Sequence, residues 1–438
     1  MSTIKITDFF QSDYVDYSSY DNLRKIASLV DGQKNASRKV LYTIMEKNIR
    51  NEIKVSQLSS KVAEFSEYLH GSVDGVITNL AQNYPGSNNI PLLVREGNFG
   101  TRFSTEPSAA RYIYTHGSNE FFDLFRKDDN AVLIKQNFEG DEIEPMFYVP
   151  NLPLLIVNGS EGVSSGFAQK VLPRDPKEVK QYIKDRLNGK KSTYNFLPAY
   201  EGFRGTIEQG ENPAQWLIKG SVDRKGINKV QITEVPVGYD LKGYIKVLDD
   251  LEDRGIIQSY RDRSEDDVFC FDVSIASKEL KTWSDEELMS KLKLIKKVSE
   301  NYTALDENNK IVVYDNIKDV MDHYIRVKID FMIKRKQNSI EELEGRIRFD
   351  MSKYEFIRRI VNEELQISKR KKSEIVADLD KVEIIYEKDG SYDYLLNMAI
   401  HSLTEERMTK LENDIKELKK ELKDLINTPA EGLWAQEI

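Results

Sequence analysis

Apolar residues near the start of the chain recur at helical spacing, which predicts two pairs of helices. Residues 17–50 are expected to form two helices around a turn at Asp31-Gly32, and residues 55–83 to form a helix-turn-helix. The second pair turns at residues 68–71, and Ser72 is a good N-cap for its second helix. In helix-turn-helix proteins the second helix usually enters the major groove of DNA, although many helical hairpins never touch DNA.

The following stretch is dominated by turns. Residues 84–118 are rich in Gly, Asn, Pro and Ser and are predicted to be mostly loop. A short apolar strand is expected at Leu152–Val157, followed by a glycine-rich turn at Asn158–Val163 that could cradle a phosphate. No Lys-Ser or Lys-Thr follows that turn, so it is not a nucleotide P-loop. Residues 139–141 (Glu-Gly-Asp) resemble a piece of a magnesium-binding motif, but no apolar strand immediately precedes them, so we interpret them as a solvated loop.

Residues 190–310 change character, because strand and helix patterns alternate there. Strands are predicted at 203–207, 216–218, 230–235 and 268–273, with helices near 240–254 and 284–299. This pattern indicates a separate α+β domain.

Residues 316–438 are highly charged and mostly helical by pattern. Two segments carry apolar residues at heptad spacing: Ile317, Val320, Tyr324, Val327 and Phe331, and then Leu411, Ile415, Leu418, Leu422 and Leu425. Two such helices separated by a spacer predict an antiparallel coiled coil with a small globular tip. The tip contains Tyr392, Tyr394, Leu395, Leu396 and Met398, a group that suits a dimer surface or core packing equally well.

Composition narrows the class of protein. The chain has 438 residues, 39% hydrophobic and 31% charged, so several folded domains are expected. The segment 21–61 has nine Lys and Arg against four acids, a net +5 within a chain of net charge −9. Such a basic face is typical of nucleic-acid binding, and a solvated helix surface is the alternative. Cys270 is the single cysteine, which fits a reducing cytoplasm, and neither a signal peptide nor a membrane span is expected.

Candidate chemistry is concentrated at Arg111–Tyr112, which follow the glycines Gly97 and Gly100. A phenol has a pKa near ~10 and is normally inert at neutral pH. A neighbouring guanidinium stabilises phenolate and holds a phosphate by paired hydrogen bonds, so the pair suits reversible phosphodiester chemistry. Tyr114 lies two residues further on, and spacing alone does not choose between the two tyrosines. Taken alone, such a pair in a chain with 22 tyrosines is usually only part of the surface.

The sequence as a whole resembles the DNA-cleaving part of type IIA topoisomerases, closest to eukaryotic topoisomerase II and the medium subunit of T-even-type phage enzymes. The resemblance runs nearly end to end, in family order. It is carried by VDGQKNASRKVLYTIM (30–45), KVSQLSSKVAEFSEYLHGS (54–72), LAQNYPGSNNIPLL (80–93), GNFGTR (97–102), SAARYIYT (108–115), EPMFYVPNLPLLIVNGSEGVSSGF (144–167), ITEVPVGY (232–239) and YDYLLNMAIHSLTEERMTKLE (392–412).

The resemblance implies a role for each matching residue. Tyr112 is expected to attack a backbone phosphate and hold the 5′ end of the cut strand, with Arg111 stabilising the scissile phosphate. Arg38 is expected to be the second cation there, and His70 to hydrogen-bond the same phosphate region. Val163 matches an aliphatic residue that wedges between base pairs and bends the DNA.

Further DNA contacts are expected from the same matches, at Lys34, Lys39, Lys54, Ser72 and Arg102. Three positions depart from the family pattern. Leu69 and Ser72 stand where a second histidine and an acid are usual, and Val163 replaces a more usual isoleucine, one methylene larger.

The implied fold is α+β and multidomain. Residues 1–172 would form a winged-helix DNA-binding domain with the tyrosine, 173–314 an α+β tower domain, and 315–438 a long antiparallel coiled coil with a helical tip that forms the C-gate. No metal ligands are expected in this chain: Mg²⁺ is expected on the TOPRIM domain and ATP on the ATPase domain of a large partner subunit. Double-stranded DNA is the expected substrate, and the C-terminal gate is expected to form a homodimer, in the host cytoplasm if the chain is phage-encoded.

Three alternatives stay open beside this interpretation. The chain could be a non-catalytic DNA-binding scaffold with a coiled-coil arm. It could also be the A subunit of a bacterial gyrase or decatenase, against which the LTEERMTKLE stretch argues. A fragment cut from a longer, fused enzyme would give the same sequence.

Overall fold

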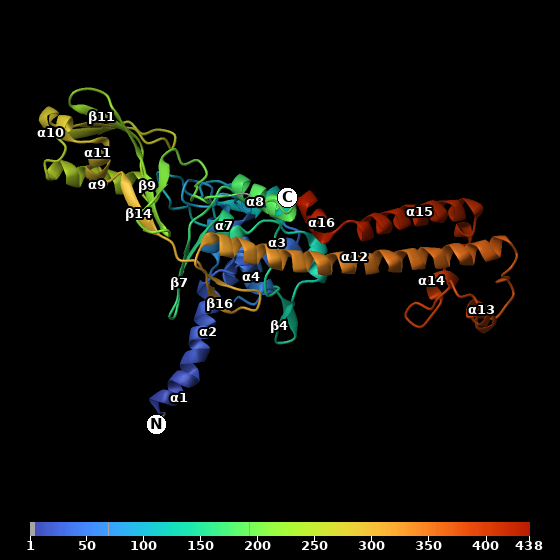
Figure 1. Ribbon diagram of the computed structural model, residues 1–438. Coiled ribbons are helices and arrows are strands. Elements are labelled where there is room, and N and C mark those ends of the chain that lie inside the picture. The colour runs from blue at the N-terminus through green and yellow to red at the C-terminus, as the bar shows by residue number, and fades with distance from the viewer. Residues whose placement is uncertain (1–4, 69, 192) are drawn as a thin grey trace. The chain divides into compact units, whose positions relative to one another are not determined.

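The computed structural model describes residues 5–68, 70–191 and 193–438 (Figure 1). The chain divides into two units, Met1–Lys328 with Glu437–Ile438, and Ile329–Gln436. We describe each unit by itself. None of the described helices combines the length and the apolar character that a membrane span requires.

The first unit begins with helices around a three-stranded sheet. The helices are α1 (Ile6–Gln11), α2 (Asp13–Lys25), α3 (Asn35–Glu46), α4 (Val55–Phe65) and α5 (Asp74–Ala81). The strands are β1 (Ile53–Lys54), β2 (Leu93–Glu96) and β3 (Tyr114–Gly117), in the order β1-β3-β2. Helix α3 is central, because its residues from 38 to 45 are all buried. The helices predicted within residues 17–50 and 55–83 are confirmed, but the N-cap residue of α5 is Val73 and not Ser72.

Short elements follow, and one of them corrects a prediction. They are α6 (Asn119–Leu124), the 3₁₀ helix η1 (Lys127–Ala131), the hairpin β4 (Gln136–Phe138) and β5 (Asp141–Ile143), α7 (Leu154–Val157), and the hairpin β6 (Ser160–Val163) and β7 (Ala168–Val171). The strand predicted at Leu152–Val157 is wrong: its last four residues form one helical turn, with all four side chains buried. The predicted glycine-rich turn is mostly strand β6.

Residues 176–313 contain helix α8 (Pro176–Leu187) and the predicted α+β domain. Its strands are β8 (Thr206–Gln209), β9 (Gln215–Lys219), β10 (Ser221–Arg224), β11 (Lys229–Glu234), β12 (Ser259–Asp262), β13 (Phe271–Ser274), β14 (Ile295–Ser299), β15 (Thr303–Leu305) and β16 (Ile311–Val313). They form the sheets β10-β11-β13-β12 and β14-β9-β8 and the pair β15-β16.

Three helices cover this domain: α9 (Leu241–Asp253), α10 (Ser277–Thr282) and α11 (Asp285–Lys291). One apolar core joins α9 to strands β11 and β13. The helix predicted over 284–299 is wrong in its second half, because Ile295–Ser299 is strand β14, antiparallel to β9.

The second unit is helical, as predicted. The 45-residue helix α12 (Ile317–Val361) enters it, and the other elements are α13 (Lys372–Leu379), α14 (Asp393–Leu396), η2 (Ile400–Ser402), α15 (Glu405–Asn427) and α16 (Ala430–Glu437). Helix α15 runs back along α12 (Figure 1), where Lys336 donates to the carbonyls of Ile426 and Thr428. The tip between these helices has its own apolar core, which contains Tyr392 and Leu395. Tyr394, Leu396 and Met398 pack against that core, which favours the core-packing alternative.

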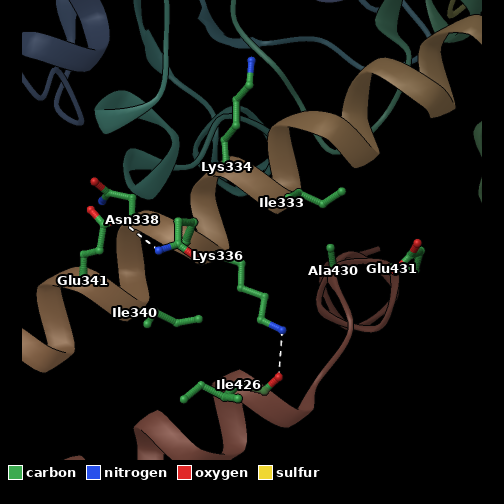
Figure 2. Close-up of a pocket in the computed structure, with 10 residues that line it drawn as sticks. Ile333, Lys334, Lys336, Asn338, Ile340, Glu341, Ile426, Ala430 and Glu431 are labelled. Atoms are coloured by element: carbon green, nitrogen blue, oxygen red, sulfur yellow. Dashed lines mark hydrogen bonds between the residues drawn. The ribbon is translucent and has the colours of Figure 1, made fainter.

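A cavity of about 700 Å³ lies in the second unit between α12 and the junction of α15 with α16 (Figure 2). Ile333 and Ile426 lie at its wall, and Lys336 crosses it to reach the Ile426 carbonyl. None of the residues expected to act on DNA lines this cavity.

Candidate active site

The predicted nucleophile lies on a turn that is anchored at several points. The Tyr112 N–H donates to the Ala109 carbonyl at 2.9 Å. The first turn of helix α4 holds both flanks of this turn: the Ser56 N–H donates to the Ala110 carbonyl at 3.2 Å, and the Val55 N–H to the Ile113 carbonyl at 3.0 Å. Ile113 is buried, whereas 66% of Tyr112 is exposed. The backbone is therefore fixed while the phenol is presented to solvent.

Arg111 is the charged neighbour of this phenol. Its guanidinium carbon lies 4.8 Å from the centre of the Tyr112 ring, a cation–π distance. The Tyr112 hydroxyl makes no hydrogen bond to any described residue, so it is free to approach a ligand. Tyr114 lies on strand β3 and pairs with Lys54 of β1 in the sheet register. The Lys54 Nζ is 5.9 Å from the Tyr114 ring, so one more cation lies on the strand beside this turn.

Arg102 lies differently from the DNA contact that was predicted. Only 5% of it is exposed, and its guanidinium donates to the carbonyls of Val235, Pro236 and Tyr239. Burial lowers its pKa, although Glu234 at 3.8 Å acts in the opposite direction. Arg102 therefore joins the loop that contains Gly97 and Gly100 to residues 235–239, and its charge does not face solvent.

Arg38, the expected second cation at the phosphate, is also buried. Its Nε and Nη2 donate to the two carboxylate oxygens of Asp31 at 2.7 and 3.1 Å, and Nη2 also reaches the Gln33 carbonyl. Burial opposes its charge, but the Asp31 carboxylate outweighs that penalty, so the pKa of Arg38 is raised. Nη1 is the guanidinium nitrogen of Arg38 for which no hydrogen bond is found within the described residues.

Lys39 is the second buried cation of helix α3. Its Nζ donates to the Glu144 carboxylate at 2.8 Å and to the Ser66 carbonyl. Burial raises the pKa of Glu144, and Lys39 acts against that rise. The basic segment is thus not one solvated face, because two of its cations neutralise buried acids.

His70 is exposed and contacts residues that the sequence did not single out. Its Nε2 lies 2.5 Å from the Tyr20 hydroxyl, and its ring packs edge-on against Tyr68. These side chains line a cavity of about 270 Å³ that Lys39 also borders. Ser72 accepts the Asp74 N–H at 3.1 Å and contacts the Ser59 hydroxyl. The predicted departure at position 69 lies outside the described residues.

Val163, the expected wedge residue, lies on a hairpin. It ends strand β6 beside the hairpin tip, opposite Ala168, and 72% of it is exposed. Lys34 does not point freely into solvent, because its Nζ donates to the Glu161 carbonyl at 2.6 Å on the same hairpin. Burial lowers the pKa of Lys34.

Sequence reasoning missed three partners of the predicted residues: Asp31, Glu144 and Tyr20. An acid paired with a buried cation gives no local pattern, because Glu144 is 105 positions from Lys39. Within the described ranges no group of three or more His, Cys, Asp or Glu side chains could hold a metal ion.

The fold is that of a topoisomerase II cleavage core. It superposes with a TM-score of 0.87 on the crystal structure of the Plasmodium falciparum topoisomerase II DNA-binding, cleavage and re-ligation domain. The two sequences are 32% identical, over 98% of this chain and 63% of that one. A family model that describes the A subunit of DNA gyrase/topoisomerase IV matches residues 24–438, and the chain belongs to this family.

Relatives of this chain include eukaryotic and viral enzymes. The chain is 32% identical to the mitochondrial DNA topoisomerase 2 of Dictyostelium discoideum, over 99% of its own length and 35% of the relative's. It is 29% identical to DNA topoisomerase 2 of invertebrate iridescent virus 6, over 99% of its length and 38% of that protein. The chain thus spans little more than a third of these relatives.

Proposed function

We propose that this chain is the DNA cleavage and religation part of an ATP-dependent type IIA topoisomerase, with Tyr112 as the nucleophile. One observation supports this above all: an exposed tyrosine on a turn fixed by helix α4, with an arginine against its ring, in a chain of this family. A rigid, oriented nucleophile lowers the entropic cost of reaching the phosphate.

The reaction is a transesterification. The Tyr112 hydroxyl oxygen forms a bond to the phosphorus, the bond from phosphorus to the 3′ oxygen breaks, and the leaving 3′ oxygen ends as a hydroxyl with the phenol proton. The 5′ end stays on the protein as a phosphotyrosine ester. Arg111 stabilises the negative charge on the phosphate, as a guanidinium does by paired hydrogen bonds. Attack by the 3′ hydroxyl reverses every step, so the break is resealed without external energy.

Other residues hold the DNA for this step. Lys54 and Ser72 are the proposed backbone contacts near the turn, and His70 faces the same phosphate. Arg38 contributes through Nη1 alone, while Lys39 and Lys34 act mainly by positioning the protein around them.

Val163 is the proposed wedge. An apolar side chain that is 72% exposed on a hairpin can enter a base step and bend the duplex. The wedge works on the double-stranded DNA that Tyr112 cuts.

We propose that the magnesium-binding and ATP-hydrolysing domains of the enzyme lie outside these residues. Mg²⁺ belongs to a TOPRIM domain and ATP to an ATPase domain, which lie either on the large subunit of an enzyme of the T-even phage type or on a longer fused protein. Two copies of this chain pair through the C-terminal gate and cut both strands, so that a second duplex passes. The winged-helix (1–172), tower (173–314) and coiled-coil (315–438) divisions stay predictions, as does a place in the cytoplasm, the host's if the chain is phage-encoded.

The experiment that tests the nucleophile uses a matched pair of tyrosines. The chain is mixed with a TOPRIM- and ATPase-containing partner, Mg²⁺ and supercoiled plasmid, and stopped with denaturant. Tyr112→Phe should abolish protein-linked, cut DNA, whereas Tyr114→Phe should retain it. Linkage that survives in Tyr112→Phe and disappears in Tyr114→Phe would show that the wrong phenol was assigned.

The same assay separates the rival functions. A DNA-binding scaffold would give no linked DNA with either tyrosine in place. A gyrase-type chain would introduce negative supercoils into relaxed plasmid with its partner and ATP, whereas a topoisomerase II-like enzyme would only relax or decatenate.

A further inference from the structure

The β6–β7 hairpin, which carries Val163, is held by the end of helix α2 and by the segment that follows this helix. The Ala27 N–H donates to the Gln169 side chain at 3.0 Å, and Lys34 reaches the Glu161 carbonyl at 2.6 Å. A Cβ on Gly162 would lie 2.1 Å from the Lys25 carbonyl oxygen, so strand β6 touches the last residue of α2 directly. These contacts hold the base and the middle of the hairpin.

The tip of the hairpin has an anchor of its own, Asp21 of helix α2. One oxygen of its carboxylate, Oδ2, accepts both the Ser165 N–H at 2.9 Å and the Ser165 hydroxyl at 3.0 Å. The other oxygen pairs with Lys25 Nζ at 2.9 Å. Asp21 is the single buried residue described for α2, with 8% of its surface exposed.

The position of Asp21 shows how it supports the hairpin tip. Ser165 is two residues beyond Val163, inside a turn closed by the Ser164 N–H on the Phe167 carbonyl at 2.9 Å. A side chain that unstacks bases meets a restoring force from the DNA, so its support must resist being pushed back. A free hairpin tip would bend away, whereas a tip tied to a helix transmits the load to α2.

We propose that Asp21 is a positioning residue for DNA bending: it holds the hairpin tip through Ser165 so that Val163 can wedge into the duplex. This inference rests on the proposed function, because it assumes that Val163 enters DNA. It assigns a role in the cleavage cycle to a carboxylate that acts through Ser165. Lys25 balances the negative charge of Asp21, and the two hydrogen bonds that Asp21 accepts from Ser165 are its contact with the hairpin tip.

The test measures DNA bending by the full chain. A duplex of about 30 base pairs with dyes at both ends reports bending by energy transfer, and 2-aminopurine at the wedge step reports unstacking. We expect Val163→Ala to weaken bending about tenfold, since the wedge no longer fills the opened step. Asp21→Ala should weaken bending by a comparable factor, although Val163 is intact.

Three further variants make the test specific. Asp16→Ala removes the same charge from an exposed position of the same helix and should bend DNA like the parent chain. Asp21→Asn keeps an oxygen that accepts from Ser165 and should restore most of the bending. Ser165→Ala removes one of the two hydrogen bonds and should give an intermediate loss, which keeps the test valid if Asp21→Ala does not fold.

The double variant Asp21→Ala/Val163→Ala decides between positioning and mere stability. If Asp21 acts through Val163, the double variant bends DNA no worse than Val163→Ala alone. Losses that multiply, or an Asp21→Ala chain that melts earlier but bends DNA normally, would overturn the proposal. A Val163→Ala chain that bends like the parent, or a parent that does not bend DNA, would instead contradict the wedge function itself.

Discussion

The buried pair Asp31–Arg38 allows a quantitative prediction for Asp31→Asn. Asp31 is fully buried and accepts four hydrogen bonds: two from Arg38, and one each from the N–H groups of Gln33 and Tyr148 at 2.9 and 3.0 Å. Asparagine keeps one acceptor oxygen, but its amide nitrogen faces donors and Arg38 loses its counter-charge. Removing one partner of a buried ion pair costs about 3–5 kcal/mol.

The expected change in stability is large enough to measure by thermal unfolding. Because asparagine retains some hydrogen bonds, we expect a loss of unfolding free energy at the lower end of this range, about 3 kcal/mol. Such a loss lowers the melting temperature by roughly 6–12 °C in a domain of this size. The control is Asp223→Asn, whose ion-pair partner is the exposed Lys225 at 3.2 Å and whose loss should cost about 0–1 kcal/mol. Equal melting temperatures for both variants and the parent would refute the structural role of Arg38.

Two further predictions test buried chemistry near the site. Because burial raises the pKa of Glu144 above its ordinary value of 4.5, the folded state binds its proton more tightly than the unfolded state. This contribution to stability is complete below pH 4.5 and is lost as pH rises through the folded pKa. The free energy of unfolding, measured by urea melts, should therefore decline less steeply with pH above 4.5 in Glu144→Gln than in the parent. In the control variant Glu142→Gln, at an exposed position, this free energy should change with pH as in the parent. Gly162→Ala should strongly destabilise the chain in the same melts, because its Cβ would lie 2.1 Å from the Lys25 carbonyl, whereas Gly226→Ala enters open space and should cost little; equal midpoints for the two would contradict the close packing.

Local patterns predicted the helices well, since apolar residues of α3 and α12 repeat within each helix. They failed where the deciding contacts are distant. Leu154–Val157 is a continuous apolar run, which suits a buried strand or a buried helix equally. Ile295–Ser299 is a strand because it pairs with β9, which lies far earlier in the chain at Gln215–Lys219.

The site residues show the same difference between local contacts, which a pattern reveals, and distant contacts, which it does not. Tyr112 and Arg111 are neighbours in sequence and lie together, and Val163 is exposed on its hairpin. Arg38 was expected to act at the scissile phosphate and Arg102 to contact DNA, yet each is buried against other residues. The partner carbonyl of Val235 lies 133 positions from Arg102, so no local pattern could show that this charge is already used.

The turn that carries Tyr112 takes its rigidity from the start of helix α4. The N–H groups of Val55 and Ser56, at the positive end of helix α4, are spent on the carbonyls of Ile113 and Ala110. The positive end of this helix is therefore satisfied by the backbone on either side of Tyr112. Attachment and display are thus separate in this turn: the first turn of α4 holds the main chain on both sides of Tyr112, and the side chain stays exposed.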